Sequence, residues 1–347
     1  MKIGILTFHQ ADSYGAVLQA YALQQTLKKL GADSEFVQIA MPQNKQPEQP
    51  ASPAAALFAR RIQAEGKKRE ALFADFRREH MRISKDYAPA DNIDGDYDCF
   101  VAGSDQIWNF RIPGADARYF LPFAAAHKRY SYAASFGADA LPEKAKDWAA
   151  KQLSVFQAIS VREASGCGIV EELTGKKAQV CLDPTLLPDR SDWEKLVERT
   201  GEEPYVLCFM LKYDETLLAK AKAEAERTGA QLKVVTAAFM PQAGMAAWNT
   251  TGVTGWLSAI ANAQCVFTNS FHGMVFSMIF GRRFHIQRLT GELSGRNGRL
   301  EELLASLELS CALEQVAEPD YDKVWQELDA RKEASLAYLR GIVNGSV

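Results

Sequence analysis

An imidazole, an amide and a hydroxyl stand together where an apolar run gives way to a helical pattern. The apolar run covers residues 265–268 and the helical pattern covers 271–280; Asn269 and Ser270 lie between them, and His272 lies in the first turn. Unpaired N–H groups and the helix dipole favour an anion at such a helix start, which Asn269 or Ser270 can cap. His272 can then donate a hydrogen bond or a proton to an anionic substrate. The alternative is a capped helix that carries an incidental histidine.

A second candidate is Arg162, which follows the short apolar segment 158–161. In a sheet of parallel strands, ligands bind beyond the carboxyl ends of the strands, where this side chain would point. The planar guanidinium of arginine suits a carboxylate or a phosphate, because it can donate two parallel hydrogen bonds. An exposed ion pair between Arg162 and Glu163 is the competing interpretation.

Polar side chains also follow the strand that we expect at 98–102. Beyond the glycine that ends this strand come Ser104, Asp105 and Gln106. Their hydroxyl, carboxylate and amide groups are typical of a loop that recognises a sugar. The alternative is a capped turn that buries Trp108 in the core.

The first strand-helix turn contains Ser13 and Tyr14. It lacks the GxGxxG pattern of dinucleotide-binding proteins, although Ser13 and the helix amides can still bind a ligand. Asp183 precedes a proline in a turn that we expect at a domain edge, with a position facing the cleft as the alternative. The remaining histidines have no spacing typical of metal ligands, so we expect no metal site.

Charge and cysteine content narrow the class of protein. The chain has 347 residues, and its 40 Lys and Arg against 43 Asp and Glu give a net charge of −3. No global positive field would therefore attract nucleic acid. The six cysteines form no CxxC pattern, and the apolar run near the N-terminus is too short for a secretory signal. We expect a cytoplasmic protein with reduced thiols and no nucleic-acid partner.

Apolar runs alternate with helical patterns along most of the sequence, which is typical of parallel sheets built from strand-helix-strand units. Strands are expected at 2–8, 34–39, 98–102, 129–135, 158–161, 178–182, 205–211, 231–236, 265–268 and 283–287. Helices are expected at 14–30, 54–82, 215–228, 255–262, 271–280, 301–309 and 323–343. The pattern predicts an α/β protein with two Rossmann-like domains that face one cleft.

A proline-rich stretch between residues 183 and 205 marks the expected domain boundary. We expect an N-terminal domain at 1–187 and a C-terminal domain with terminal helices at 188–347. Within the first, residues 41–90 form an insertion, with a proline-rich loop and a basic helical stretch interrupted by Gly66. Such a helix can rest on the anionic surface of a membrane, or it can be a solvated helix that covers the sheet.

In this order, the motifs resemble those of the polysaccharide pyruvyl transferase family. The resemblance runs from about Gly4 to Gly281 and continues into the segment GRNGRLEELL. It rests on ILTFHQADSYGAVLQAYALQQTL, VAGSDQIWN, SYAASFG, SVREASG, VCLDPTLL and TNSFHGMVFSMIFG. The family is similar in fold to GT-B glycosyltransferases, which agrees with the two domains expected above.

The family moves the carboxyethylidene group of phosphoenolpyruvate onto a sugar, forms a pyruvate ketal and releases phosphate. The resemblance implies that His272 and Arg162 are the catalytic residues and bind phosphoenolpyruvate together with Asn269 and Ser270. His272 would donate a proton to the methylene carbon or bind the phosphate. Phosphoenolpyruvate is then a co-substrate, and no cofactor or metal is expected.

The acceptor would be a sugar that is nucleotide-linked, lipid-linked or part of a polymer. It would contact the polar side chains of two turns, namely Ser13, Tyr14, Ser104, Asp105 and Gln106. The base that deprotonates its hydroxyl is Asp105 or Glu163. Two alternatives remain: a GT-B-type glycosyltransferase that uses a nucleotide sugar, and a catalytically silent sugar-binding subunit.

Overall fold

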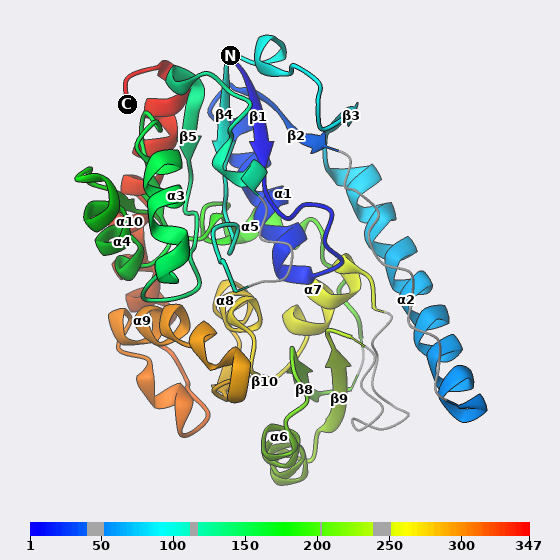
Figure 1. The fold of residues 1–347 in the computed structure, drawn as a ribbon. Coiled ribbons are helices and arrows are strands. Elements are labelled where there is room, and N and C mark those ends of the chain that lie inside the picture. Colours follow the sequence, from blue (N-terminus) through cyan, green and yellow to red (C-terminus); the bar gives the residue numbers. More distant parts are fainter. Residues whose placement is uncertain (40–51, 112–116, 202, 239–250) are drawn as a thin grey trace.

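Two parallel sheets, each with helices packed around it, lie at opposite ends of the molecule (Figure 1). The computed structural model describes residues 1–39, 52–111, 117–201, 203–238 and 251–347. The α/β class that we expected is confirmed, because every pair of adjacent strands within these sheets is parallel.

The first sheet has five strands in the order β3-β2-β1-β4-β5. Isolated parallel bridges, such as the one between Ala134 and Val161, continue it towards the strand pair β6 and β7. The carboxyl ends of all these strands therefore lie at one edge. The strands are β1 (Lys2–Leu6), β2 (Asp33–Ile39), β3 (Ile83–Tyr87), β4 (Cys99–Ala102), β5 (Arg129–Ser131), β6 (Ser160–Val161) and β7 (Gln179–Val180).

The second sheet has four strands in the order β11-β10-β8-β9. Its central strands are entirely buried, which explains why they appear in the sequence as continuous apolar runs. The strands are β8 (Tyr205–Met210), β9 (Gln231–Thr236), β10 (Cys265–Thr268) and β11 (Arg283–Ile286).

Local signals set the ends of several helices. At the start of α6, Asp214 accepts a hydrogen bond from the N–H of Leu217, and Gly229 ends the helix in the left-handed region with φ of 66°. The helices are α1 (Tyr14–Lys29), α2 (Pro53–His80), α3 (Glu143–Leu153), α4 (Ala164–Thr174), α5 (Arg190–Glu194), α6 (Glu215–Thr228), α7 (Val253–Ala261), α8 (Phe271–Ile279), α9 (Gly298–Ser306) and α10 (Tyr321–Asn344).

The structure departs from the sequence-based expectations in a few elements. The strand β3 was not expected, because its sequence ISKDY is largely polar and lies at a sheet edge. The interruption expected at Gly66 is wrong: α2 passes through it as one helix, and a side chain there would meet nothing within 4 Å. Much of the expected proline-rich loop lies outside the described residues, at 40–51.

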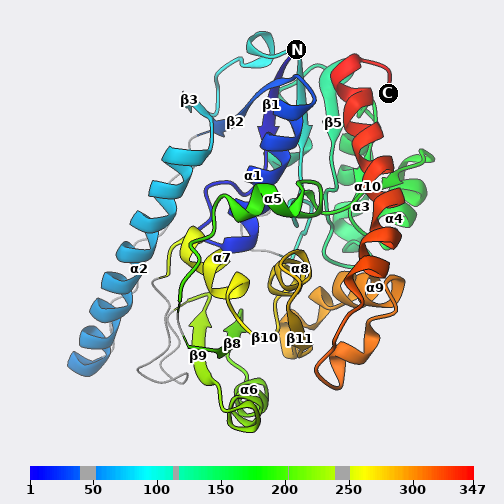
Figure 2. The ribbon, with the colours of Figure 1, turned by 180° about the vertical axis from the view of Figure 1, so that it is seen from behind.

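The last helix returns to the first sheet (Figure 2). In α10, Tyr338 donates a hydrogen bond to the carbonyl of Ser131 at 2.9 Å, and the Ser335 hydroxyl accepts one from the N–H of Leu182 at 3.0 Å. The helix thus packs on the N-terminal half, although it comes last in the chain. A division between residues 187 and 188 stays a prediction, and α10 would belong with the first unit.

Within the described ranges, no helix is both long enough and apolar enough to cross a membrane. The longest of those helices, α2, carries exposed basic side chains that include Arg60, Lys67 and Lys68. The peripheral membrane contact considered for this segment stays a prediction.

Replacing a buried residue of α10 tests how strongly this helix supports the first sheet. Leu339 is fully buried in the core that includes residues of both halves. We expect Leu339→Ala to lower the free energy of unfolding by about 2–5 kcal/mol, because it leaves a cavity. Arg340→Ala on the exposed face of the same helix should change it by less than about 0.5 kcal/mol. Equal values for both variants, measured by denaturant unfolding, would contradict the packing described here.

Candidate functional site

The imidazole of His272 lies at the start of α8, directly after β10. Ser270 caps this helix: its hydroxyl accepts a hydrogen bond from the N–H of Gly273 at 3.3 Å. The hydroxyl of Thr268, at the end of β10, in turn accepts one from the N–H of Ser270 at 3.1 Å. These bonds fix the turn, and they leave the side chain of His272 only 8% exposed, in the first turn of the helix.

The same imidazole meets the N-terminal half at a glycine. A Cβ atom placed on Gly15, in the first turn of α1, would lie 2.0 Å from Nδ1 of His272. No side chain fits in that space, so only glycine allows the ring to sit against the backbone of α1. His272 therefore lies where the starts of α1 and α8 meet.

Arg162 follows β6 and is paired with a buried carboxylate. Its Nη1 donates a hydrogen bond to Oδ2 of Asp183 at 2.6 Å, and the two side chains are 3% and 0% exposed. Such burial excludes the exposed Arg162–Glu163 pair that was the competing interpretation. Each charge offsets the desolvation of the other, so removal of either partner would leave an uncompensated buried charge.

Asp183 links this arginine to the histidine. Its Oδ2 atom lies 3.5 Å from Nε2 of His272, a distance at which the two groups interact electrostatically but form no hydrogen bond. Its Oδ1 atom accepts hydrogen bonds from the N–H and the hydroxyl of Thr185. Burial raises the pKa of Asp183, but His272 and Arg162 outweigh it and hold this pKa well below its usual range. Asp183 thus caps its turn, and its other carboxylate oxygen lies between Arg162 and His272 without lining the cavity.

Two further carboxylates surround the guanidinium of Arg162. Oδ1 of Asp105 lies 3.5 Å from Nη2, and Oε2 of Glu163 lies 3.9 Å from Nε. Oε1 of Glu163 is held by the hydroxyl of Ser135 and the N–H of Phe136. Burial raises the pKa of Asp105, whereas the positive charge of Arg162 is the leading influence that lowers it below its usual value. Arg162 is therefore enclosed by carboxylates on several sides.

A cavity of about 240 Å³ opens beside this cluster. Both halves of the chain contribute to its wall: α1 and its preceding turn on one side, β8, α7 and α8 on the other. It is lined by Phe8, Ala11, Ser13, Tyr14, Gly15, Ala16, Asp105, Gln106, Phe209, Leu211, Ala237, Trp256, Ser270, Phe271, His272 and Arg299. Of the residues singled out in the sequence, Ser13, Tyr14, Asp105, Gln106, Ser270 and His272 meet here.

Three of the expected site residues lie behind the cavity wall instead. Asn269 uses both ends of its amide on the backbone of the loop after β8: its oxygen accepts from the N–H of Leu211, and its nitrogen donates to the carbonyl of Lys212. The hydroxyl of buried Ser104 donates to the carbonyl of Ala133. Neither side chain lines the cavity, and Arg162 does not line it either. Asn269 and Ser104 hold loops in place in this structure.

Tyr14 reaches the cavity as an aromatic wall. Its hydroxyl donates to the carbonyl of Thr251 at 2.7 Å. Its ring is buried and stacks on Trp256, with 4.9 Å between the ring centroids and an interplanar angle of 7°. The phenol oxygen therefore already has a partner across the two halves.

Sequence reasoning assigned no role to Arg299. This residue stands in the first turn of α9, far along the chain from the other cavity residues, and its side chain reaches the cavity wall. The segment GRNGRLEELL belonged to the family resemblance but gave no indication of where its arginine would point.

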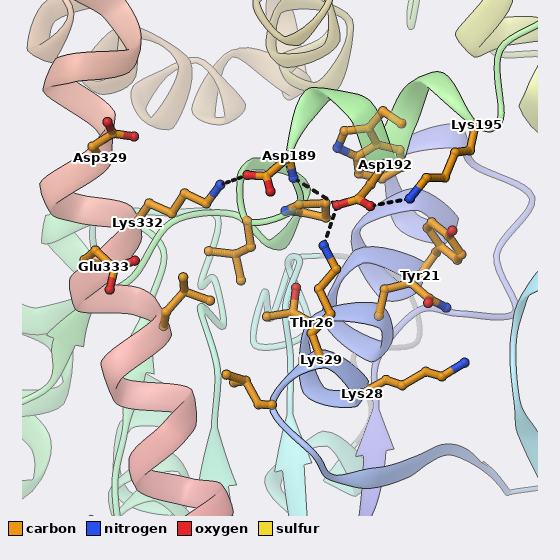
Figure 3. A pocket seen from close by; sticks show the side chains of 16 residues that line it. Tyr21, Thr26, Lys28, Lys29, Asp189, Asp192, Lys195, Asp329, Lys332 and Glu333 are labelled. Atoms are coloured by element: carbon orange, nitrogen blue, oxygen red, sulfur yellow. Dashed lines mark hydrogen bonds and ion pairs between the residues drawn. The ribbon is translucent and has the colours of Figure 1, made fainter.

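A larger groove of about 910 Å³ lies between α1, α5 and α10 (Figure 3). Its charges are paired with one another: Asp192 accepts from Lys29 and Lys195, and Asp189 accepts from Lys332. In the described part of the chain, every buried polar side-chain atom that lacks a partner lies outside this groove. By contrast, His272, Gln106 and Arg299 at the smaller cavity each have such an atom. The smaller cavity is thus the better candidate site.

The side chains that could bind a metal ion are not clustered in the described part of the chain. Among the residues that the structure describes, no group of three or more His, Cys, Asp or Glu side chains is arranged to hold a metal ion.

Comparison with known proteins finds a family whose model matches more than half of this chain. A family model described as polysaccharide pyruvyl transferase matches residues 14–286. No functionally curated protein matches the chain.

Similar solved structures are distant in sequence. Arabidopsis thaliana UGT89C1 has 10% identity and a TM-score of 0.47, covering 99% of both chains. UDP-GlcNAc 2-epimerase from Neisseria meningitidis, bound to UDP-GlcNAc, has 9% identity and a TM-score of 0.47, covering 98% of this chain and 93% of its own. The glycosyltransferase SsfS6 of Streptomyces sp. SF2575, complexed with thymidine diphosphate, has 14% identity and a TM-score of 0.42, covering 99% of both. The expected GT-B-like class is confirmed by two parallel α/β sheets with one cavity between them.

Removing the buried carboxylate should weaken the whole cluster. We expect Asp183→Asn to lower the free energy of unfolding by about 3–5 kcal/mol, because it leaves Arg162 without its closest partner. The folded pKa of Asp183 lies below its unfolded value of about 3.9, so its stabilisation is present above about pH 4 and is lost as the pH falls further. The acid limb of stability against pH should therefore be shallower in the variant.

Asp189→Asn is the matched control, because that side chain is exposed, its ion pair with Lys332 lies at the surface, and asparagine serves equally well as the N-cap of α5. Its unfolding curve should resemble that of the wild type across the same pH series. If Asp183→Asn behaved like this control, the buried carboxylate would not be the centre of the cluster.

The contact between Gly15 and His272 can be tested with one methyl group. Gly15→Ala would place that methyl 2.0 Å from Nδ1, so the imidazole must move or the halves must separate. We expect the imidazole resonances of His272 to shift in NMR spectra, and stability to fall by about 1–3 kcal/mol. Gly66→Ala, in open space on α2, should leave those resonances in place and should not destabilise the protein. Unshifted resonances in Gly15→Ala would contradict the contact.

Proposed function

Because the chain belongs to the polysaccharide pyruvyl transferase family, we propose that it moves the carboxyethylidene group of phosphoenolpyruvate onto a sugar of a polysaccharide or its precursor. The products are a pyruvate ketal and phosphate. The observation that carries this proposal is a small cavity in which buried nitrogen atoms of His272 and Gln106 have no hydrogen-bond partner among the described residues. Buried polar groups are nearly always paired, so such atoms are ready for a ligand.

His272 is the proposed proton donor to the methylene carbon of phosphoenolpyruvate. Once that carbon is protonated, C2 becomes an oxocarbenium-like electrophile, which a sugar hydroxyl attacks. Phosphate then leaves C2, and a second hydroxyl closes the ketal. Two protons leave the hydroxyls, one replacing the proton given to the methylene carbon and one departing with phosphate. A protonated imidazole would face the carboxylate of Asp183 at 3.5 Å, which favours a fixed ring orientation.

The start of α8 is the proposed place for the leaving phosphate. Ser270 caps the helix with its hydroxyl, so the remaining N–H groups of the first turn and the helix dipole point toward the cavity end of the helix. Such donors stabilise negative charge that grows in the transition state. We therefore propose that Ser270 contributes to phosphate binding by fixing the turn at the start of α8. Asn269 fixes the same turn through its bonds to the backbone of the loop after β8.

Arg162 remains part of the proposed donor site, but it does not donate two parallel hydrogen bonds to phosphoenolpyruvate. Its Nη1 is committed to Asp183, whereas its Nε atom is buried without a hydrogen-bond partner. Oε2 of Glu163 lies 3.9 Å from that Nε atom, and Arg162 does not line the cavity, so its proposed contribution is to orient the carboxylate that faces His272.

Asp105 is the better of the two candidate bases for the acceptor hydroxyl. It lines the cavity, whereas Glu163 does not and has one oxygen held by two donors. Gln106 and Ser13 line the same cavity, and we propose that they contact the acceptor.

Direct assay tests the proposed function. The protein is incubated with phosphoenolpyruvate and a panel of nucleotide-linked, lipid-linked and polymeric sugars, and both released phosphate and the acid-labile ketal are measured. Acceptor-dependent phosphate release with ketal formation would support the proposal. Turnover of nucleotide sugars alone, without any reaction of phosphoenolpyruvate, would favour a glycosyltransferase and overturn it.

Replacing the imidazole separates proton donation from binding. We expect His272→Gln to fold normally and to lose about 10²- to 10⁴-fold in kcat, because an amide can donate a hydrogen bond but cannot act as an acid. The measurement is steady-state kinetics with phosphoenolpyruvate and an active acceptor.

His127→Gln is the control, since that histidine is exposed on the first half. Turnover of His272→Gln close to that of this control would show that the proton comes from another group. A loss confined to the affinity for phosphoenolpyruvate would assign His272 to phosphate binding instead.

A further inference from the structure

Two arginines lie against the same aromatic ring, and their surroundings differ. The guanidinium carbons of Arg162 and Arg299 are 5.4 Å and 5.3 Å from the ring centroid of Phe271. Arg162 lies among Asp183, Asp105 and Glu163 and does not line the cavity. Arg299 does line it.

Arg299 has hydrogen-bond donors that no group of the described chain uses. Its Nε and Nη1 atoms are buried, and neither has a hydrogen-bond partner among the described residues. Nor does any carboxylate there lie within ion-pair distance of its guanidinium. Burial and, to a lesser degree, the like charge of Arg162 lower the pKa of Arg299 to about 10, so the group stays protonated at neutral pH.

A buried guanidinium with unused donors costs stability. Removing a polar group from water without a new hydrogen bond is unfavourable, and a nearby like charge adds to the cost. Phe271 offsets part of it through a cation–π contact. The charges of Asp105, Glu163 and Asp183 offset a further part from beyond ion-pair distance. An anion in the cavity would bond to the unused donors directly, and charge-assisted hydrogen bonds are the strongest available to a guanidinium.

From this juxtaposition we infer that Arg299 is the direct anion ligand of the cavity, whereas Arg162 is a positioning residue that acts mainly through Asp183. The ligand is a small organic anion that carries a carboxylate or a phosphate. Its identification as phosphoenolpyruvate rests on the proposed function. Arg299 would then hold one anionic group of the donor, and the start of α8 with His272 would hold the other.

The size and walls of the cavity agree with such a ligand. Its volume of about 240 Å³ is below the usual range of about 300–1,000 Å³ for ligand pockets. Arg299 and Ser270 both line it, so two anion-binding groups are available to one small molecule. A donor with two anionic groups should therefore bind more tightly than one with a single group.

The test compares Arg299→Gln with Arg288→Gln by calorimetric titration of phosphoenolpyruvate and, separately, inorganic phosphate. Arg288 lies nearby in the chain, is exposed and pairs with Glu301, so it is the matched control. We expect Arg299→Gln to weaken phosphoenolpyruvate binding about 10- to 100-fold, as for the loss of a charge-assisted hydrogen bond, and Arg288→Gln to leave it unchanged. Arg299→Lys, which keeps the charge but loses the planar fork, should fall between them.

Thermal stability distinguishes a ligand-binding role from a structural one. Since the guanidinium of Arg299 is desolvated, lies near the like charge of Arg162 and forms no ion pair with a described carboxylate, Arg299→Gln should melt at the same temperature as the wild type or higher. A merely structural residue would lose stability and affinity together. Lower melting temperatures for both Arg299→Gln and Arg299→Lys would therefore overturn the inference.

The two titrations separate this inference from the proposed function. If the wild type binds phosphoenolpyruvate and Arg299→Gln binds it equally well, the inference fails while the proposed function stands. If the wild type binds phosphate but not phosphoenolpyruvate, the proposed function fails, and a loss of phosphate binding in Arg299→Gln would still support the anion site. Wild-type protein that binds neither anion would overturn both.

Discussion

A single buried carboxylate, that of Asp183, connects the groups on which the candidate site depends. It pairs with Arg162 after β6 and faces His272 at the start of α8, so it joins one residue from each half of the chain. An isolated charge at this depth would be strongly destabilising, and only the combination of a guanidinium, an imidazole and the two donors of Thr185 makes it tolerable. The same requirement that keeps the carboxylate ionised also fixes where the arginine and the histidine stand.

Because Asp183 pairs with Arg162, the two arginines near the cavity have different roles. Arg162 is surrounded by carboxylates, and its charge is therefore largely compensated within the protein. Arg299 stands at the cavity wall, with buried donors that the described chain leaves unpaired. A site that binds an anion needs a positive charge that no carboxylate of the protein already pairs with. It also needs a rigid surrounding structure that keeps the cationic side chain from forming such a pair. Arg162, which is ion-paired, supplies that structure, and Arg299, which forms no ion pair with a described carboxylate, supplies the charge.

The sequence predicted most of this fold because its strands are buried on both faces and appear as apolar runs between helical patterns. It also located His272 and Arg162, since both follow a strand at its carboxyl end. The sequence did not show that Asp183 contacts both Arg162 and His272, because an Asp-Pro pair is equally typical of a turn. Nothing local distinguishes Asn269 and Ser104, which bond to backbone, from Gln106, which keeps a free donor at the cavity. The helix at 323–343 was predicted, but its packing on the first sheet and the position of Arg299 at the cavity were not, because both depend on tertiary contacts and periodicity reports only neighbours along the chain.

Buried polar atoms without hydrogen-bond partners, rather than volume, distinguish the candidate site from the larger groove. The groove between α1, α5 and α10 is several times larger, yet lysines and carboxylates that line it bond to one another. These paired charges are not available to bind a ligand. At the small cavity, the starts of α1 and α8 approach so closely that Gly15 leaves no room for a side chain beside His272. Neither half alone can form that surface, because the imidazole comes from one and the backbone that confines it comes from the other. The two halves together place more hydrogen-bond donors than acceptors around this cavity, so nitrogen atoms of His272, Gln106 and Arg299 have no partner among the described residues. A bound anion would supply the missing acceptors.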